Sequence, residues 1–239
     1  MRFHQLTDWL QWLQTLHPSS IELGLSRVSL VARRLDLLTP NAQVVTVAGT
    51  NGKGSTVAHL NGLLMASVVG QRPARVGCYT SPHLVHFSER IRVDGVSADE
   101  QTICDALAQV DEARFHVDGP DLAASEPISL TYFEFTTLAA LLIFKQAELD
   151  YWVLEVGLGG RLDAVNIVDA DVSVITNIDI DHQGWLGDTR ECIAIEKAGI
   201  ARKGRPLVIG DDNPPSTLID EIARLGAHPI WLADALDTD

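Results

Sequence analysis

The chain has 239 residues, a formal net charge of −14 and a hydrophobic fraction of 46%. That length accommodates one large domain or two small ones, and the hydrophobic content is ample for a buried core. The acidic balance excludes a general nucleic-acid or anionic-membrane binder, since both need a surplus of lysine and arginine. An anionic ligand therefore needs a local positive site.

The sequence also bears on location. No segment approaches the ~18 consecutive apolar residues of a membrane span, and the amino-terminal segment lacks the apolar core of a signal peptide. Cys78, Cys104 and Cys192 are far apart and have no metal-type or disulfide-type spacing, which favours reduced thiols. We therefore expect a cytoplasmic monomer that binds neither nucleic acid nor membrane.

Strands and helices are expected to alternate along the chain. Apolar residues at three- and four-residue steps predict a first helix over residues 3–16, ending before Pro18. The next expected elements are a strand at 44–47, a helix at 53–68, a strand at 74–79, a half-exposed strand at 89–95, a helix at 99–115, a polar loop at 116–129 and a helix at 130–148 capped by Ser129. Last come buried strands at 150–157 and 171–178, a helix at 189–201, a strand at 206–209, a helix at 215–225 and a strand at 228–232. This alternation predicts an α/β fold, a mostly parallel sheet with helices on both faces.

A glycine-rich stretch, AGTNGKGST (48–56), joins the first buried strand to the next helix. Backbone N–H groups and a helix amino terminus bind phosphate, Lys53 adds a point charge, and a hydroxyl of Ser55 or Thr56 can reach Mg²⁺. The predicted nucleotide-binding residues are Gly49, Thr50, Asn51, Gly52, Lys53, Gly54, Ser55 and Thr56. Gly54 departs from the usual pattern, in which Ser or Thr follows Lys directly. A flexible turn between core elements is the alternative interpretation.

Polar residues end three other predicted strands, where ligands of parallel sheets gather. Glu155 could hold Mg²⁺ beside the phosphates or simply cap its strand. His182 could be a metal ligand or a structural histidine, and the hydroxyl of Ser81 could reach the same metal. The segment TNID (176–179) only faintly matches a guanine-reading motif, because it lacks the lysine.

The motifs GTNGKGST, YTSPHL, LTYFEF, EVGLGGRLDAVN, DHQGWLG and EKAGI, in this order, resemble the folylpolyglutamate synthase and dihydrofolate synthase family of the Mur-ligase class. The resemblance runs from about residue 5 to the end, and the inserted glycine is the family's own form of the loop. ELGLSRV (22–28) and LTYFEF (130–135) look most like the bifunctional bacterial members.

The resemblance implies an ATP-dependent carboxylate–amine ligase that uses Mg²⁺, dihydropteroate, folates and L-glutamate, and that works through an acyl phosphate. It implies phosphate binding by residues 52–55, metal binding by Ser81, Glu155 and His182, and carbamylation of Lys197, which is otherwise an ordinary helix-surface lysine. Lys53, His182 and Lys197 are thus the predicted catalytic residues. The predicted pteroate-binding residues are Glu22, Leu23, Gly24, Leu25, Thr131, Tyr132, Phe133, Leu162, Asp163 and Ala164, with one of Tyr132 and Phe133 expected in the core.

The resemblance also implies a domain organisation. Residues 1–239 would be an ATP- and pteroate-binding domain, like the central domain of Mur ligases and incomplete at its carboxyl end. The carboxyl-terminal domain of the family would be absent, and a separate domain would supply the adenine and glutamate contacts. The final ALDTD offers no closing helix, which favours the same interpretation. The alternatives are a non-catalytic ATP- or pterin-binding fragment and, less favoured, a P-loop NTPase switch.

Overall fold

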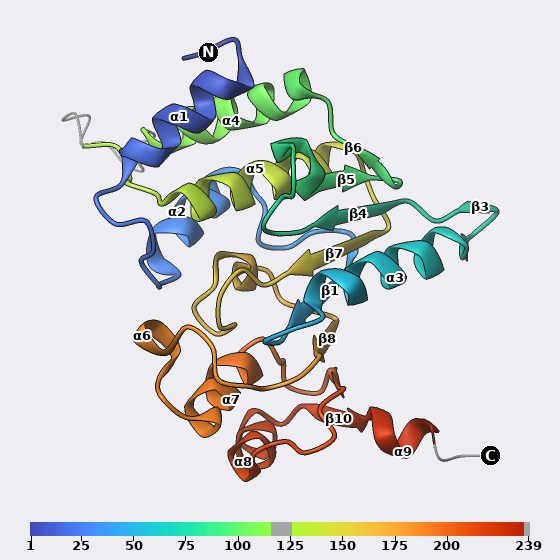
Figure 1. Cartoon of the computed structure of the whole chain (residues 1–239). Helices are drawn as coiled ribbons and strands as arrows, with labels where there is room; N and C mark the ends of the chain where they lie inside the picture. The colour runs from blue at the N-terminus through green and yellow to red at the C-terminus, as the bar shows by residue number, and fades with distance from the viewer. Residues whose placement is uncertain (116–125, 237–239) are drawn as a thin grey trace.

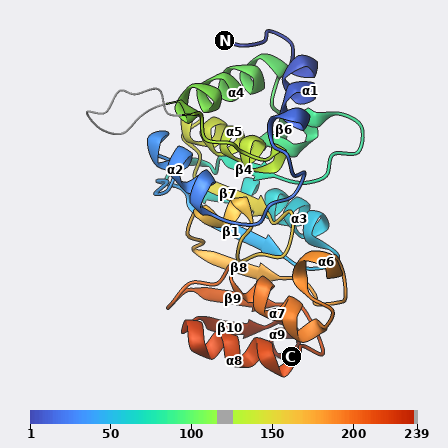
Figure 2. The same ribbon diagram turned by 90° about the vertical axis from the view of Figure 1, so that its left-hand side faces the viewer.

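A computed structural model describes residues 1–115 and 126–236, in which an eight-stranded sheet forms the centre of the molecule (Figure 1). Its strands are β1 (Gln43–Ala48), β4 (Val76–Tyr79), β5 (Ile91–Val93), β6 (Val96–Ser97), β7 (Tyr151–Glu155), β8 (Val172–Ile175), β9 (Pro206–Ile209) and β10 (His228–Trp231). Their order is β10-β9-β8-β1-β7-β4-β5-β6, most of which can be followed in Figure 2. Neighbours from β10 to β4 run parallel, and β5 and β6 add an antiparallel edge. The mostly parallel sheet expected from the sequence is confirmed.

Helices cover both faces of this sheet, as the sequence predicts. They are α1 (Leu6–Leu16), α2 (Ser26–Arg34), α3 (Lys53–Met65), α4 (Glu100–Arg114), α5 (Tyr132–Gln146), α6 (Gln183–Leu186), α7 (Arg190–Ala198), α8 (Ser216–Leu225) and α9 (Leu232–Leu236), with 3₁₀ turns η1 (Phe87–Arg90) and η2 (Ala164–Ile167). A hairpin of β2 (Val68–Val69) and β3 (Arg72–Pro73) lies outside the sheet. In the described residues, no helix is both long enough and apolar enough to cross a bilayer.

The two faces differ in what covers them. Successive side chains of a strand point to opposite faces, and β1 shows this clearly. Val45 and Val47 pack with Val57 of α3 in a small cluster, whereas Val44 and Ala48 belong to the large core that includes residues of α1, α2, α4 and α5. Figure 1 accordingly shows α3 on one side of the sheet and α2 on the other.

Several local predictions need correction. Ser129 does not cap α5: Thr131 does, since its Oγ1 accepts a hydrogen bond from Glu134 N at 3.2 Å while Glu134 Oε2 accepts one from Thr131 N at 2.7 Å. This reciprocal pair is a capping box, which starts the helix two residues later than expected. The half-exposed strand at 89–95 begins only at Ile91, because the preceding residues form η1.

Other differences lie at element ends. The helix expected to reach Val68 ends at Met65, and Val68 instead opens the β2–β3 hairpin. The helices α2 and α6 have no counterpart in the predicted order, and the final segment does contain a helix, α9. Of the polar loop expected at 116–129, residues 116–125 lie outside the described residues, and 126–129 have no regular structure.

The strand register brings the predicted site residues to one edge. Val47 of β1 pairs with Glu155 of β7, Ala48 pairs with Ile175 of β8, and Tyr79 of β4 pairs with Leu154. The four strands are parallel, so their carboxyl ends meet at the same edge of the sheet. The glycine loop, Ser81 and the segment after β8 all begin there.

Candidate active site

The loop at 49–52 requires glycine at its two ends. Gly49 has a φ of +152° and Gly52 a φ of +82°, in the region that favours glycine. A Cβ on Gly49 would also lie 1.8 Å from Oγ1 of Thr176, which is impossible without displacing that residue. The loop therefore fits closely against the end of β8, which favours a built site over a flexible turn.

The segment after β8 holds this loop in place through several hydrogen bonds. Asn177 O accepts from Thr50 N at 3.0 Å, Asn177 Oδ1 accepts from Asn51 N at 2.8 Å, and Thr176 Oγ1 donates to Asn51 O at 2.6 Å. Asp179 N also donates to Thr50 Oγ1 at 3.0 Å. The TNID segment thus supports the loop in this structure, a role that sequence reasoning missed because nothing local indicates which residues pair across the sheet.

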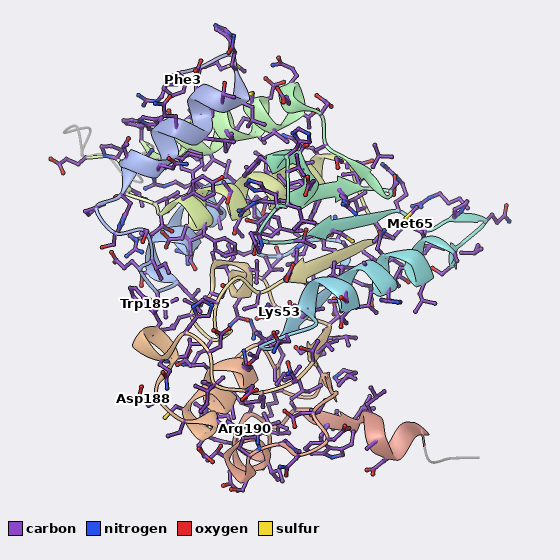
Figure 3. The ribbon with its side chains drawn as sticks, in the orientation of Figure 1. Phe3, Lys53, Met65, Trp185, Asp188 and Arg190 are labelled. Carbon is purple, nitrogen blue, oxygen red and sulfur yellow. The ribbon has the colours of Figure 1, made fainter. Side chains whose placement is uncertain are left out.

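The amino terminus of α3 is open to an anion. Its N-cap, Gly52, has no side chain to accept from the first N–H groups, and the first turn contains no acidic residue. Such N–H groups and the helix dipole attract negative charge. Lys53 lies at this point (Figure 3), and its Nζ donates to Gly49 O at 2.9 Å and to Thr50 O at 3.2 Å. The exposed Ser55 and the half-buried Thr56 follow in the same turn.

Glu155 lies directly beside this helix terminus. Its side chain is buried, and Oε2 accepts a hydrogen bond from Ser81 N at 3.0 Å. Burial raises the pKa of this carboxyl group, while Ser81 N–H and the charges of Lys53 and Arg90 oppose the shift. A Cβ on Gly54 would lie 3.7 Å from both Glu155 carboxylate oxygens. Glycine after Lys53 therefore leaves the carboxylate uncovered toward the loop.

The predicted metal ligands approach one another but do not form a preorganised cage. His182 has a φ of +48°, its imidazole is half exposed, and its Nε2 lies 3.6 Å from Asp181 Oδ2. Among the described residues, no three His, Cys, Asp or Glu side chains form a metal-binding group. A buried carboxylate beside a hydroxyl residue, open toward a phosphate loop, suits Mg²⁺, which binds through few protein oxygens and keeps several waters. The donor set fits that ion.

Lys197 is buried rather than on the surface, with 3% of its area exposed. Burial and, to a lesser extent, the nearby charge of Lys53 lower the pKa of its amine to about 8, and Asp181 opposes the shift. A small cavity of about 20 Å³ is lined by Lys197 together with Lys53, Gly49 and His182. The EKAGI lysine thus faces the phosphate loop, and the ordinary-surface interpretation is wrong for its position.

A larger cavity of about 350 Å³ opens next to the predicted metal ligands Ser81, Glu155 and His182, called the metal group below. Of the residues predicted to bind pteroate, it is lined by Glu22, Leu23, Gly24, Thr131, Phe133, Leu162, Asp163 and Ala164, and Ser81 and His182 line it as well. Leu25 and Tyr132 do not line it: Leu25 precedes α2 and packs against the core, and Tyr132 packs on Phe87 with ring centroids 6.4 Å apart. Both rings are half-buried and pack against the core, so neither is a core residue, and Phe133 is the one that lines the cavity.

Asp163 has a structural part in this cavity. Its Oδ2 accepts from Leu158 N at 2.8 Å and its Oδ1 from Val165 N at 3.0 Å, which fixes the turn leading into η2. Burial raises the pKa of this carboxyl group to about 7, and the backbone N–H groups oppose the shift. The turn that carries Leu162 and Ala164 thus depends on Asp163.

The cavity also contains charged residues that sequence reasoning missed. Glu134 is buried and pairs with Arg27 of α2 at 3.1 Å, and Arg27 pairs with Glu22 too. Arg90, at the end of η1, lines the cavity and donates from Nε to His83 Nδ1 at 2.8 Å. The sequence does not single out Arg90, because ERIRV has the alternating pattern of a half-exposed strand. Only the fold places it beside Ser81.

Comparison with known proteins places these features in a family. The model of the Mur ligase middle domain matches residues 47–233. Dihydrofolate synthase/folylpolyglutamate synthase of Escherichia coli is 50% identical over 222 residues, which are 93% of this chain and 49% of that protein. A structure of E. coli FolC in complex with DHPP and ADP superposes with a TM-score of 0.86 at 50% identity, over 95% of this chain and 51% of that one.

A second structure matches over the same share of each chain. A bifunctional folylpolyglutamate synthase/dihydrofolate synthase with Mn, AMPPNP and L-glutamate bound is 48% identical, with a TM-score of 0.81 over 95% of this chain and 51% of that chain. The chain thus spans about half the length of the curated relatives that it matches. On the match of the family model and the shared architecture, the chain belongs to the Mur ligase middle-domain family.

Proposed function

We propose that this chain carries the ATP-, metal- and pteroate-binding part of an ATP-dependent ligase that joins L-glutamate to the carboxylate of dihydropteroate or a folate. One observation carries the proposal: Ser81 and His182 belong to the predicted metal group and also line the 350 Å³ cavity. An acid bound in that cavity would therefore lie next to the phosphate loop, with Ser81 and His182 between them. The relatives support the same chemistry, since their names describe folate glutamate ligases and their structures contain ADP, AMPPNP, Mn and L-glutamate.

The reaction balances as two substitutions. A carboxylate oxygen of the acid attacks the γ-phosphorus of ATP, the bond to the β–γ bridging oxygen breaks, and ADP leaves. The amine of glutamate then attacks the acyl carbon of the acyl phosphate, the bond to the phosphate oxygen breaks, and phosphate leaves while the nitrogen loses a proton. Because both reactants of the first step are anions, positioning and charge neutralisation contribute most of the catalysis.

The residues of the chain have separate parts in this step. The N–H groups at the start of α3 and the amine of Lys53 hold the phosphates, with Ser55 or Thr56 as hydroxyl donor. Ser81, Glu155 and His182 would hold Mg²⁺, which supplies Lewis-acid neutralisation of the phosphoryl oxygens when bound. The cavity orients the acid through Phe133 and its neighbours.

Lys197 has a separate, chemical part. Because the pKa of its amine is lowered to about 8, a substantial neutral fraction exists near neutral pH. A neutral amine adds to CO₂ with loss of a proton and becomes a carbamate. We propose this modification, which would turn a buried cation into an anion that faces the metal group. The proposal agrees with the position of Lys197 beside Lys53 and His182.

A second function remains compatible with the half-length match. The chain spans about half the length of its relatives, and the second candidate is a chain that binds ATP and pterin without turnover until a carboxyl-terminal domain completes the site. We propose that it is a cytoplasmic monomer completed in this way. The switch-NTPase alternative is weaker, because TNID supports the loop.

The test measures ADP release from Mg-ATP by the purified chain, with dihydropteroate and glutamate each omitted in turn. We expect weak or no release by the chain alone, and release that needs both co-substrates once the carboxyl-terminal half of the E. coli relative is appended. Lys53→Ala should abolish it, whereas Lys203→Ala, at an exposed lysine, should not. Release independent of dihydropteroate would indicate an NTPase, and none in the extended chain would indicate a binding fragment.

A further inference from the structure

We propose that Arg90 binds the carboxylate of the acid substrate and holds it at the boundary between the apolar cavity and the metal group. This assignment rests on the proposed function and adds to it a specificity-determining residue. It concerns the charged end of the substrate, which none of the predicted pteroate-binding residues accounts for.

Arg90 is a buried cation with unused hydrogen-bonding capacity. Only 9% of its area is exposed, and it lines the 350 Å³ cavity. Its Nε donates to His83, but Nη1 and Nη2 have no hydrogen-bond or ion-pair partner in the described part of the chain. Neither amino group is among the buried side-chain atoms that lack a hydrogen-bond partner in the described residues, so both remain accessible from the cavity. A carboxylate that enters the cavity can therefore accept hydrogen bonds from both groups.

The other charged groups of the cavity are already compensated. Glu22 and Glu134 both pair with Arg27, and His17 Nε2 lies 3.2 Å from Glu22. Asp163 accepts two backbone N–H groups. Among the described lining residues Arg90 is therefore the cation left for a ligand, in a chain whose net charge of −14 otherwise repels anions.

The surroundings of Arg90 fix its orientation. Its guanidinium carbon lies 5.6 Å from the ring centroid of Phe87 and 5.7 Å from that of Tyr132, distances typical of cation–π contacts. With Nε bound to His83 and two rings beside it, the planar group has little rotational freedom. A preorganised fork of two amino groups matches the two oxygens of a carboxylate.

The backbone places this fork next to the reacting centre. Arg90 O accepts from Thr80 N at 2.9 Å, so Arg90 lies directly across from the residue that precedes Ser81. Ser81, the next residue, donates its N–H to Glu155 Oε2 at 3.0 Å, so the predicted metal ligands begin one residue beyond this contact. A carboxylate held by Arg90 therefore lies where phosphate transfer would occur, while the apolar part of the acid fills the cavity along Phe133.

The test compares two ligands on the full chain by isothermal titration calorimetry: dihydropteroate and its carboxamide, which has the same rings but no charge. In the wild type we expect dihydropteroate to bind more tightly than the amide. Arg90→Met should weaken dihydropteroate binding by about 10- to 100-fold, the usual effect of losing a charged hydrogen bond. It should change amide binding by less than about twofold, on the same reasoning.

Two further variants sharpen the result. Arg90→Lys keeps the charge without the fork, so an intermediate loss is expected. Arg92→Met, at an exposed arginine two residues along, should leave both affinities unchanged. An equal loss for acid and amide in Arg90→Met would mean that Arg90 only supports the fold, and no loss for either would mean that it does not contact the ligand; both overturn the assignment. If the wild type binds neither ligand, the pteroate cavity itself is wrong.

Discussion

Two buried ionisable side chains, one an acid and one a base, lie at the phosphate loop. Glu155 is a carboxyl group whose pKa is raised by burial, and Lys197 is an amine whose pKa is lowered by burial. Each shift favours the neutral form, so each charge is costly until a ligand compensates it. Mg²⁺ would compensate the carboxylate of Glu155, and the proposed carbamylation would remove the positive charge of Lys197. These groups are thus poised for binding at the expense of stability of the free chain.

The cost at Lys197 is measurable as a pH dependence of stability. The pKa of the folded state, about 8, lies below the unfolded value of 10.5, so the stabilising contribution is present above pH 10.5 and is lost as pH falls through 8. Lys197→Met removes this titration. Relative to the wild type, the free energy of unfolding of Lys197→Met should increase by on the order of 3 kcal/mol as the pH is lowered from 10.5 to 7.

The measurement is urea unfolding across this pH range in CO₂-free buffer, because CO₂ would react with the neutral amine. Lys203→Met, at an exposed lysine, is the matched control and should follow the wild type throughout. A difference between Lys197→Met and wild type that stays constant with pH would show that Lys197 does not titrate as a buried amine.

At the scale of elements, the sequence predicts what depends on local signals. The glycine loop, the buried strands and the position of Glu155 at the carboxyl end of β7 follow from short motifs and apolar runs. His182 is farther from its strand than expected, because β8 ends at Ile175 and His182 precedes α6. What it misses depends on contacts distant in sequence, such as the pairing of Asn177 with Asn51. Arg90 is missed for the same reason, since no local pattern places it across from Thr80.

The start of α5 shows how two neighbouring candidates are separated. Ser129 and Thr131 are both plausible caps by residue type, but only Thr131 has a glutamate three positions later that can reciprocate. Thr131→Ala should lower the free energy of unfolding by about 1 kcal/mol. Ser129→Ala should change it by less than about 0.5 kcal/mol, as at ordinary surface sites.

Denaturant unfolding of the two variants under identical conditions checks this prediction. A loss at Ser129→Ala equal to or larger than the loss at Thr131→Ala would contradict the observed cap. Thr131 also lines the large cavity, so the stability measurement is made without ligand.

At the scale of the molecule, the sheet brings four strand ends together, and with them the phosphate loop, the metal group and the cavity. The alternation of elements predicts this arrangement, because parallel strands carry their functional residues at one edge. The helix α2 was not predicted, yet it carries the Arg27 that neutralises Glu22 and Glu134. The chain spans about half the length of the curated relatives that it matches.

The most direct test of the proposed ligase chemistry follows an oxygen atom from the carboxylate of the substrate into the released phosphate. Dihydropteroate labelled with ¹⁸O in its carboxylate is turned over with Mg-ATP and glutamate by the chain extended with the carboxyl-terminal half of the E. coli relative. If the carboxylate attacks the γ-phosphate, one labelled oxygen is transferred to each phosphate released, and mass spectrometry of the phosphate will show it. Phosphate that carries oxygen from water instead, or no phosphate release at all, would contradict a ligase built on this site.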